Sequence, residues 1–241
     1  MSAGLAAMPE SLTEAQCDAI RREFDGRRVT NAILSATFNI IHPNREVRES
    51  GFESFALLAR FAKRMGASLL SVSTGTCDPE DMWRKHSENE GEEAWREMLA
   101  SMSRLAAIAE ECDVTIAFEP EQANIVDSAR KARALIDTLQ SNKVKVLIDP
   151  ANLLNLSNVG QQDGVLKEAF DLLGEDIVFA HAKEFCADGR LGTVALGRGV
   201  VNFPLYLSLL RSAGYENALV LHGFPEEDVS ESLGYLRGMP L

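Results

Sequence analysis

The sequence predicts an α/β fold built on a parallel sheet, of the (β/α)-barrel type. Short apolar runs alternate with longer amphipathic stretches along the chain. Several of these runs contain almost no polar residue, which is typical of strands covered on both faces. Polar residues suited to chemistry follow one run after another, where barrel enzymes keep their sites. No Gly-rich fingerprint follows the first run, so an open dinucleotide-binding sheet is disfavoured.

Six apolar runs bounded by polar or turn residues are predicted to be strands. They are Val29–Thr37, Ser68–Ser73, Val114–Phe118, Val144–Ile148, Ile177–Ala180 and Ala218–Leu221. Because a closed barrel of this type has eight strands, we expect an incomplete TIM-barrel-like fold with six recognisable strands.

Amphipathic stretches before, between and after these strands are predicted to be helices. They are Thr13–Phe24, Phe52–Met65, Glu92–Glu111, Ser128–Leu139, Gly164–Leu173, Pro204–Ser212 and Val229–Arg237. Strands alternating with helices imply right-handed crossovers and parallel pairing. Ser11 with Glu14 predicts a capping box at the first helix, and Gly66 and Gly214 stand where helix C-caps belong.

Length and composition predict one domain over residues 1–241. The chain has 241 residues, of which 46% are apolar, as in an ordinary globular interior. No run approaches the ~18 apolar residues of a membrane span. The first residues also lack the basic start and apolar centre of a signal peptide. We therefore expect a cytoplasmic protein with no membrane partner.

The charge of the chain bears on its partners, and its cysteines bear on its redox state. The 36 acidic and 24 basic residues give a net charge of −12 without a basic stripe, so we expect no nucleic-acid partner. The four cysteines are widely spaced and form no CxxC pair, which indicates reduced thiols. Only Cys77, in the loop TGTCDPED, stands where a reactive thiol would be noticed.

Four polar residues at the ends of successive predicted strands suggest a metal site. Glu119 directly follows VTIAF, Asp149 follows VKVLI and His181 follows DIVFA. His222 follows ALVL in the same way and could supply a fourth ligand. Any one of them alone reads as a turn residue or a hydrogen-bonded surface group. Together they predict one divalent ion, Mn²⁺, Zn²⁺, Mg²⁺ or Co²⁺, because oxygen and imidazole ligands suit these metals.

Five segments at the predicted strand ends carry a family resemblance: IAFEPEQAN at 116–124, VLIDPANLL at 146–154, FAHAKEF at 179–185, LGRGVVNFPLYLSLL at 196–210 and ALVLHGF at 218–224. Their order and spacing resemble the sugar-phosphate isomerase/epimerase superfamily, whose barrels are xylose isomerase-like. More locally, SATFNIIHPNREVRESGF at 35–52 and SVSTGTCDPEDMW at 71–83 resemble one subgroup of isomerase-like proteins. The resemblance implies a metal-dependent isomerase or epimerase of a sugar or sugar-like polyol, in carbohydrate metabolism.

The resemblance also implies residue roles. Glu119, Asp149 and His181 fall on three of the family's four metal positions, and the fourth, usually a glutamate, is His222 here. In the family's epimerases the glutamates at the first and fourth positions also exchange protons with the substrate carbon. We therefore expect Glu119 and His222 to be catalytic, with Glu226 as another candidate partner of Glu119.

Polar and aromatic residues in the loops around the strand ends are the predicted substrate contacts. They are Asn39, His42, Trp83, Glu121, Lys183 and Arg198. Lys183 and Arg198 could hold substrate hydroxyls or a phosphate, or could be ordinary solvated cations. Trp83 could instead pin its own loop.

Relative to the family, the chain begins where the second helix is expected, so two strands are expected to be missing. This would leave open edges at Val29–Thr37 and Ala218–Leu221, and open edges invite pairing with another chain. We expect either a homodimer or edges covered by helices and the N-terminus.

Two further functions stay open. A metal-dependent lyase or dehydratase would use the same proton abstraction and then expel a hydroxyl. A non-catalytic barrel relative that binds a ligand or partner chain is favoured by His222 and by the missing strands. An endonuclease is least favoured, because four histidines are too few for its metal site and the charge is wrong for DNA.

Overall fold

The computed structural model describes residues 8–239, which fold as two compact units. Among the described residues, the first unit comprises 8–119, Ala123–Ile125 and Leu135–Lys145. The second comprises Pro120–Gln122, Val126–Ala134 and 146–239. The expectation of a single domain over residues 1–241 stays a prediction.

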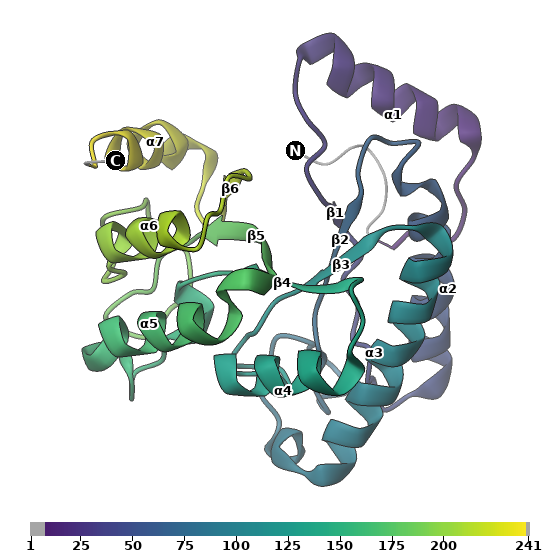
Figure 1. Ribbon diagram of the computed structural model, residues 1–241, viewed down its shortest axis with the longest axis horizontal. Coiled ribbons are helices and arrows are strands. Elements are labelled where there is room, and N and C mark those ends of the chain that lie inside the picture. Colours follow the sequence, from purple (N-terminus) through teal and green to yellow (C-terminus); the bar gives the residue numbers. More distant parts are fainter. Residues whose placement is uncertain (1–7, 240–241) are drawn as a thin grey trace. The chain divides into compact units, whose positions relative to one another are not determined.

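The first unit contains three parallel strands and the helices between them. The strands are β1 (Leu34–Ser35), β2 (Leu69–Val72) and β3 (Thr115–Phe118), and β2 pairs with both of the others. The helices are α1 (Glu14–Arg27), α2 (Arg45–Ala62), the 3₁₀ helix η1 (Ser87–Glu90) and α3 (Glu92–Cys112). The two long helices, α2 and α3, pack against each other (Figure 1).

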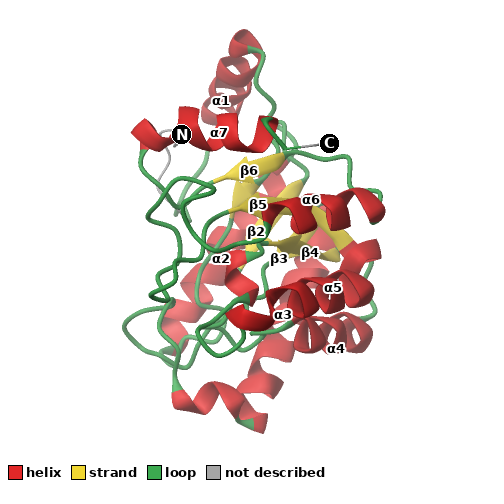
Figure 2. Ribbon diagram, turned by 90° about the vertical axis from the view of Figure 1, so that its left-hand side faces the viewer, coloured by secondary structure: helices red, strands yellow, loops and turns green. Residues whose placement is uncertain are grey.

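The second unit repeats this plan. Its strands are β4 (Val144–Ile148), β5 (Ile177–Ala182) and β6 (Leu219–Leu221), and β5 pairs in parallel with both of the others. Its helices are α5 (Gln162–Leu173), α6 (Phe203–Ser212), α7 (Val229–Arg237) and the 3₁₀ helices η2 (Ala151–Leu153), η3 (Val159–Gln161), η4 (Gly174–Asp176) and η5 (Glu226–Asp228). Figure 2 shows α5 and α6 side by side. The division between the units runs through β4 and through α4 (Ala129–Leu139).

The strands confirm the predicted class. The described residues contain six strands that alternate with helices, as an incomplete barrel requires, and the pairings within each unit are all parallel. In β3 only the first residue is partly exposed, and in β4 only Lys145 is. Strands buried on both faces are expected where helices cover a parallel sheet. Each unit has large buried aromatic side chains, Phe55 and Phe118 in the first and Phe179 and Phe203 in the second.

The first helix begins two residues later than the predicted capping box. The cap is Thr13, whose hydroxyl accepts from the Gln16 N–H, while the Gln16 side chain accepts from the Thr13 N–H at 2.8 Å. The prediction of Ser11 with Glu14 was therefore wrong. Thr13 with Gln16 has the same four-residue spacing, and this pair satisfies two backbone donors of the helix start.

The first predicted strand is much shorter than expected. Only Leu34–Ser35 is a strand, whereas Val29–Thr37 was predicted. The end of α1 takes up the earlier residues, because the Val29 N–H donates to the Phe24 carbonyl and Arg28 adopts a left-handed conformation. In the same way, α2 begins at Arg45 and not at Phe52, since the Asn44 side chain caps it.

Gly66 and Gly214 close helices as predicted. Gly66 has φ +89° and Gly214 has φ +72°. The next residue in each case donates back to the last turn, Ala67 to the Ala62 carbonyl and Tyr215 to the Leu210 carbonyl, both at 3.0 Å. This is the Schellman arrangement, which favours glycine at the left-handed position.

Among residues 8–239, none of the helices combines the length and the apolar character that a membrane crossing requires.

Two glycines of the second unit test the backbone argument separately from packing. An added methyl at Gly164, inside α5, or at Gly214 would meet nothing within 4 Å, but only Gly214 has a positive φ. We expect Gly214→Ala to lower the free energy of unfolding by about 1–2 kcal/mol. Gly164→Ala should raise it by about 0.5–1 kcal/mol. Denaturant unfolding of both variants measures this, and changes of the same sign would contradict it.

Candidate metal centre

Three of the four predicted ligands lie at the carboxyl ends of the strands of the second unit. Asp149 directly follows β4, and His222 directly follows β6. His181 was expected just after its strand, but β5 continues to Ala182 and His181 lies within it, opposite Val220. Parallel strands end on the same edge of a sheet, so the three side chains come together.

The ligand atoms of these three residues all lie within 4.8 Å of one another. The Nε2 atom of His222 lies 3.0 Å from Oδ2 of Asp149, and Nδ1 of His181 lies 3.8 Å from the same oxygen. The two imidazole rings are tilted by 55° with centroids 4.3 Å apart. One carboxylate oxygen is therefore the common centre of the group.

These separations fit a shared divalent ion. Metal bonds to imidazole nitrogen and carboxylate oxygen are about 2.0–2.2 Å long, so two ligands on one ion lie about 3 Å apart at a right angle and about 4 Å apart when opposed. The distances of 3.0 and 3.8 Å fall within that range. Two imidazoles and a carboxylate also match the ligand chemistry of Zn²⁺ and Mn²⁺.

The charge at Asp149 is balanced by its neighbours. Its side chain is buried, with 1% of the residue exposed, and Nζ of Lys183 lies 3.4 Å from Oδ2. Burial acts to raise the pKa of the Asp149 carboxyl, but Lys183, His222 and His181 outweigh it and hold the pKa below its ordinary value. The carboxyl is thus ionised near neutral pH, as a metal ligand must be.

Lys183 was predicted to contact the substrate, and the structure also gives it a partner in the protein. Its Nζ donates to Oδ1 of Asn152, in η2, at 2.6 Å. An ammonium group next to a ligand carboxylate competes with a cation for that oxygen. The Asn152 amide offers Lys183 a neighbouring acceptor when the carboxylate is engaged elsewhere.

Tyr206 of α6 fixes the backbone that carries two of the ligands. Its hydroxyl is directed at the carbonyls of His181, at 3.0 Å, and of Ile148, at 3.2 Å. Ile148 immediately precedes Asp149, so the tyrosine holds the ends of β4 and β5 at the same level. Sequence reasoning missed this residue. The available signal was a tyrosine among apolar helix residues, because a buried tyrosine hydroxyl needs a partner.

A second buried carboxylate ties down the loop after β5. Glu184 is fully buried, and its oxygens accept from the N–H groups of Gly197, at 2.7 Å, and Val201, at 3.3 Å. Burial raises the pKa of Glu184 even though these N–H groups act to lower it. The same loop carries Arg198, which is exposed and pairs with Glu231 of α7 at 2.5 Å. A substrate contact by Arg198 stays a prediction.

Glu119 belongs to the first unit. It directly follows β3, is half-buried, and its N–H donates to the Val72 carbonyl at 3.3 Å. Glu121 belongs to the second unit and is buried, with its N–H donating to Val126 at 3.0 Å. The ligand role of Glu119 and the substrate role of Glu121 stay predictions.

Two of the predicted contacts in the first unit, Asn39 and His42, bond to loop backbone. The amide nitrogen of Asn39 donates to the Thr76 carbonyl at 2.8 Å, and its oxygen accepts from the Thr76 N–H at 3.1 Å. Nε2 of His42 lies 3.2 Å from the Pro79 carbonyl, and its Nδ1 accepts from Asn44. Trp83 is 53% exposed. Contacts of Asn39, His42 and Trp83 with a substrate stay predictions.

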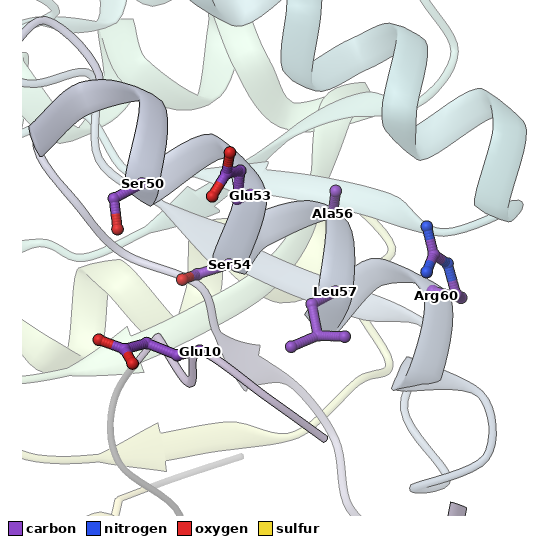
Figure 3. A pocket seen from close by; sticks show the side chains of 7 residues that line it. All are labelled: Glu10, Ser50, Glu53, Ser54, Ala56, Leu57 and Arg60. Carbon is purple, nitrogen blue, oxygen red and sulfur yellow. The ribbon is translucent and has the colours of Figure 1, made fainter. Parts of the chain in front are cut away.

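A hollow of about 520 Å³ lies along α2 in the first unit (Figure 3). It is lined by Glu10, Ser50, Glu53, Ser54, Ala56, Leu57 and Arg60. None of the residues that line it belongs to the group of Asp149, His181 and His222.

Comparisons with known proteins show the family and the fold. The profile of the family described as xylose isomerase-like TIM barrel matches residues 3–239. A search among curated proteins found no match. Three similar solved structures are the zinc-bound IolI protein, the 3-keto-D-glucoside 4-epimerase YcjR from E. coli and the probable 3-DHS dehydratase AsbF from Bacillus anthracis.

These three structures share the fold at low identity. The zinc-bound protein is 17% identical with a TM-score of 0.68, covering 92% of this chain and 78% of its own. The epimerase is 17% identical with a TM-score of 0.70, covering 93% and 85%. The dehydratase is 14% identical with a TM-score of 0.73, covering 94% and 83%.

The metal centre is tested by removing its central ligand. We expect Asp149→Asn to weaken Mn²⁺ binding by at least about tenfold, because a neutral amide replaces the anionic oxygen that both imidazoles approach. Asp171→Asn, at an exposed position of α5 in the same unit, should bind Mn²⁺ as the native chain does. Isothermal titration measures both, and equal affinity of Asp149→Asn and the native chain would contradict the site.

Proposed function

Because the chain belongs to the xylose isomerase-like TIM barrel family, we propose that it is a metal-dependent isomerase or epimerase of a sugar or sugar-like polyol. The observation that carries the proposal is the convergence of Asp149, His181 and His222 on one point at the strand ends. Among similar structures, one is a sugar epimerase and another holds zinc, which supports the same reaction class and cofactor.

A divalent ion held by Asp149, His181 and His222 would polarise a substrate carbonyl and so acidify the neighbouring C–H group. Glu119 is the proposed base that removes this proton, and we propose that it also ligates the ion. Return of the proton to the carbonyl carbon, with the hydroxyl proton passing to the carbonyl oxygen, gives an isomer and can use Glu119 alone. Delivery of a proton to the original carbon from the other face gives an epimer, and this route needs a second proton carrier.

His222 and Glu226 compete for that second role. Nε2 of His222 is the atom that faces Asp149 at 3.0 Å, and a nitrogen that ligates an ion cannot carry a proton at the same time. Glu226 begins η5, four residues later, and is exposed to solvent. We assign the ligand role to His222 and the proton return to Glu226 in the metal-bound state. In this scheme His222 takes part in catalysis by holding the ion.

Lys183 is the proposed substrate-orienting cation. It is buried, it lies 3.4 Å from Oδ2 of Asp149, and its ammonium group has three donors for oxygen atoms. A substrate hydroxyl or phosphate next to the ion would meet this group. Arg198 is the second candidate, but its pairing with Glu231 would first have to open.

A dehydratase is the second candidate, favoured by one similar structure that is described as such. Removal of the same proton would be followed by loss of a hydroxyl from the next carbon.

A non-catalytic role is favoured by His222, which stands where the family's epimerases carry a glutamate. The homodimer and the cytoplasmic location expected from the sequence stay predictions.

The proposed chemistry is tested by proton exchange in deuterated water. We expect the Mn²⁺-loaded chain to introduce deuterium next to the carbonyl of at least one member of a ketose panel, measured by NMR. Glu119→Gln should slow this exchange by about 100-fold or more, because an amide cannot accept the proton. Glu175→Gln, at an exposed residue of η4, should leave the exchange unchanged.

The panel also separates the alternatives. A dehydrated product would replace the isomerase by the dehydratase. Binding of a ketose without exchange or product would contradict both enzymes and support the non-catalytic role. Full activity of Glu119→Gln would remove Glu119 from the mechanism.

A further inference from the structure

The loop after β2 contains a second group of potential ligands that the proposed reaction does not use. Ligand atoms of Cys77, His86 and Glu88 all lie within 4.8 Å of one another. Cys77 and His86 are half-buried, and Glu88 is exposed in η1. We propose that these three residues form a separate binding site for a zinc-type divalent cation.

The ligand chemistry distinguishes this site from the one at Asp149. A thiolate, an imidazole and a carboxylate are all zinc ligands, and sulfur favours zinc over hard ions such as Mg²⁺. The group at Asp149 contains no sulfur. Three protein ligands also leave a fourth tetrahedral position, which a water molecule or another small ligand would take.

The loop holds the ligands close together without a cation. The side chain of Asn89, only 2% exposed, accepts from the Cys77 N–H at 2.9 Å and donates to the Ala123 carbonyl at 2.9 Å. The Thr76 hydroxyl donates to the Arg84 carbonyl at 3.0 Å. These bonds join the segment of Cys77 to the segment that leads to His86 and Glu88. Metal binding would therefore require little further ordering of this loop.

The charges around Cys77 favour a cation. Burial, together with Glu88 and Glu97, raises the pKa of the Cys77 thiol. The same two carboxylates attract a positive ion to this place. The basic residues of the segment have acidic partners, Arg84 with Asp78 at 2.5 Å and Lys85 with Glu90 at 3.1 Å. Their charges are therefore largely neutralised within the segment.

Binding of the cation by His86 would break only one weak hydrogen bond. Nδ1 of His86 accepts from the Glu88 N–H at 3.3 Å, which is long for a hydrogen bond. If Nδ1 binds the cation, only this weak bond is lost. If Nε2 binds it, the proton moves to Nδ1 and the same bond is lost.

Cobalt(II) tests the site in the full chain, because thiolate–cobalt coordination gives a charge-transfer band in the near ultraviolet. We expect the native chain and Asp149→Asn to show this band on titration with Co²⁺, since the site at Asp149 has no sulfur. Cys77→Ser should abolish the band and His86→Ala should weaken binding by about tenfold or more. Cys112→Ser, which changes a half-buried cysteine at the end of α3, should retain the band.

A native chain without the band, or a band that survives Cys77→Ser, would overturn the proposal. A second measurement needs no variant. Zn²⁺ should slow alkylation of Cys77 by iodoacetamide by at least about tenfold, followed by peptide mass spectrometry, because a metal-bound thiolate is a poor nucleophile. An alkylation rate of Cys77 that Zn²⁺ does not change would equally overturn it.

Discussion

The candidate centre depends on one buried carboxylate and the nitrogen groups of Lys183, His181 and His222 that surround it. Removing an ionised carboxyl from water costs several kcal/mol unless opposite charge or hydrogen bonds replace the solvent. At Asp149 this compensation comes from Lys183, His181 and His222, each on or just after a strand end. The three strands of the second unit must therefore end at matching levels. Where a cation binds, it would take over part of the balance that Lys183 now provides.

Polar side chains bonded to distant backbone groups keep the loops in place. Tyr206 is directed at two strand-end carbonyls, and Glu184 accepts two N–H groups of the following loop. In the first unit, asparagine side chains hold the loop after β2 in the same way. Asn39 and Asn89 bond to backbone groups of this loop, and Asn124 accepts from two N–H groups of the same loop at 3.1 Å. Such bonds satisfy buried backbone groups and leave the strand-end residues in fixed positions.

Much of the fold could be predicted because burial and periodicity are local. The strand Val144–Ile148 and the helix at 229–237 have the expected bounds. The sequence does not show which of two neighbouring elements will use a given backbone group. The Val29 N–H was expected in a strand, but it donates to the end of α1. Strand-end position predicted Asp149, His181 and His222, but their common oxygen arises from contacts between residues distant in sequence. The group around Cys77 lies within residues 77–88, and the conformation of that loop brings its members together. A single sequence shows such residue types without showing which of them meet.

Anomalous diffraction from crystals of the Mn²⁺-loaded chain tests the central claim most directly. We expect a strong manganese peak with Oδ2 of Asp149, Nε2 of His222 and a ring nitrogen of His181 at bonding distance, about 2.0–2.2 Å. The absence of a manganese peak beside Asp149 would contradict it.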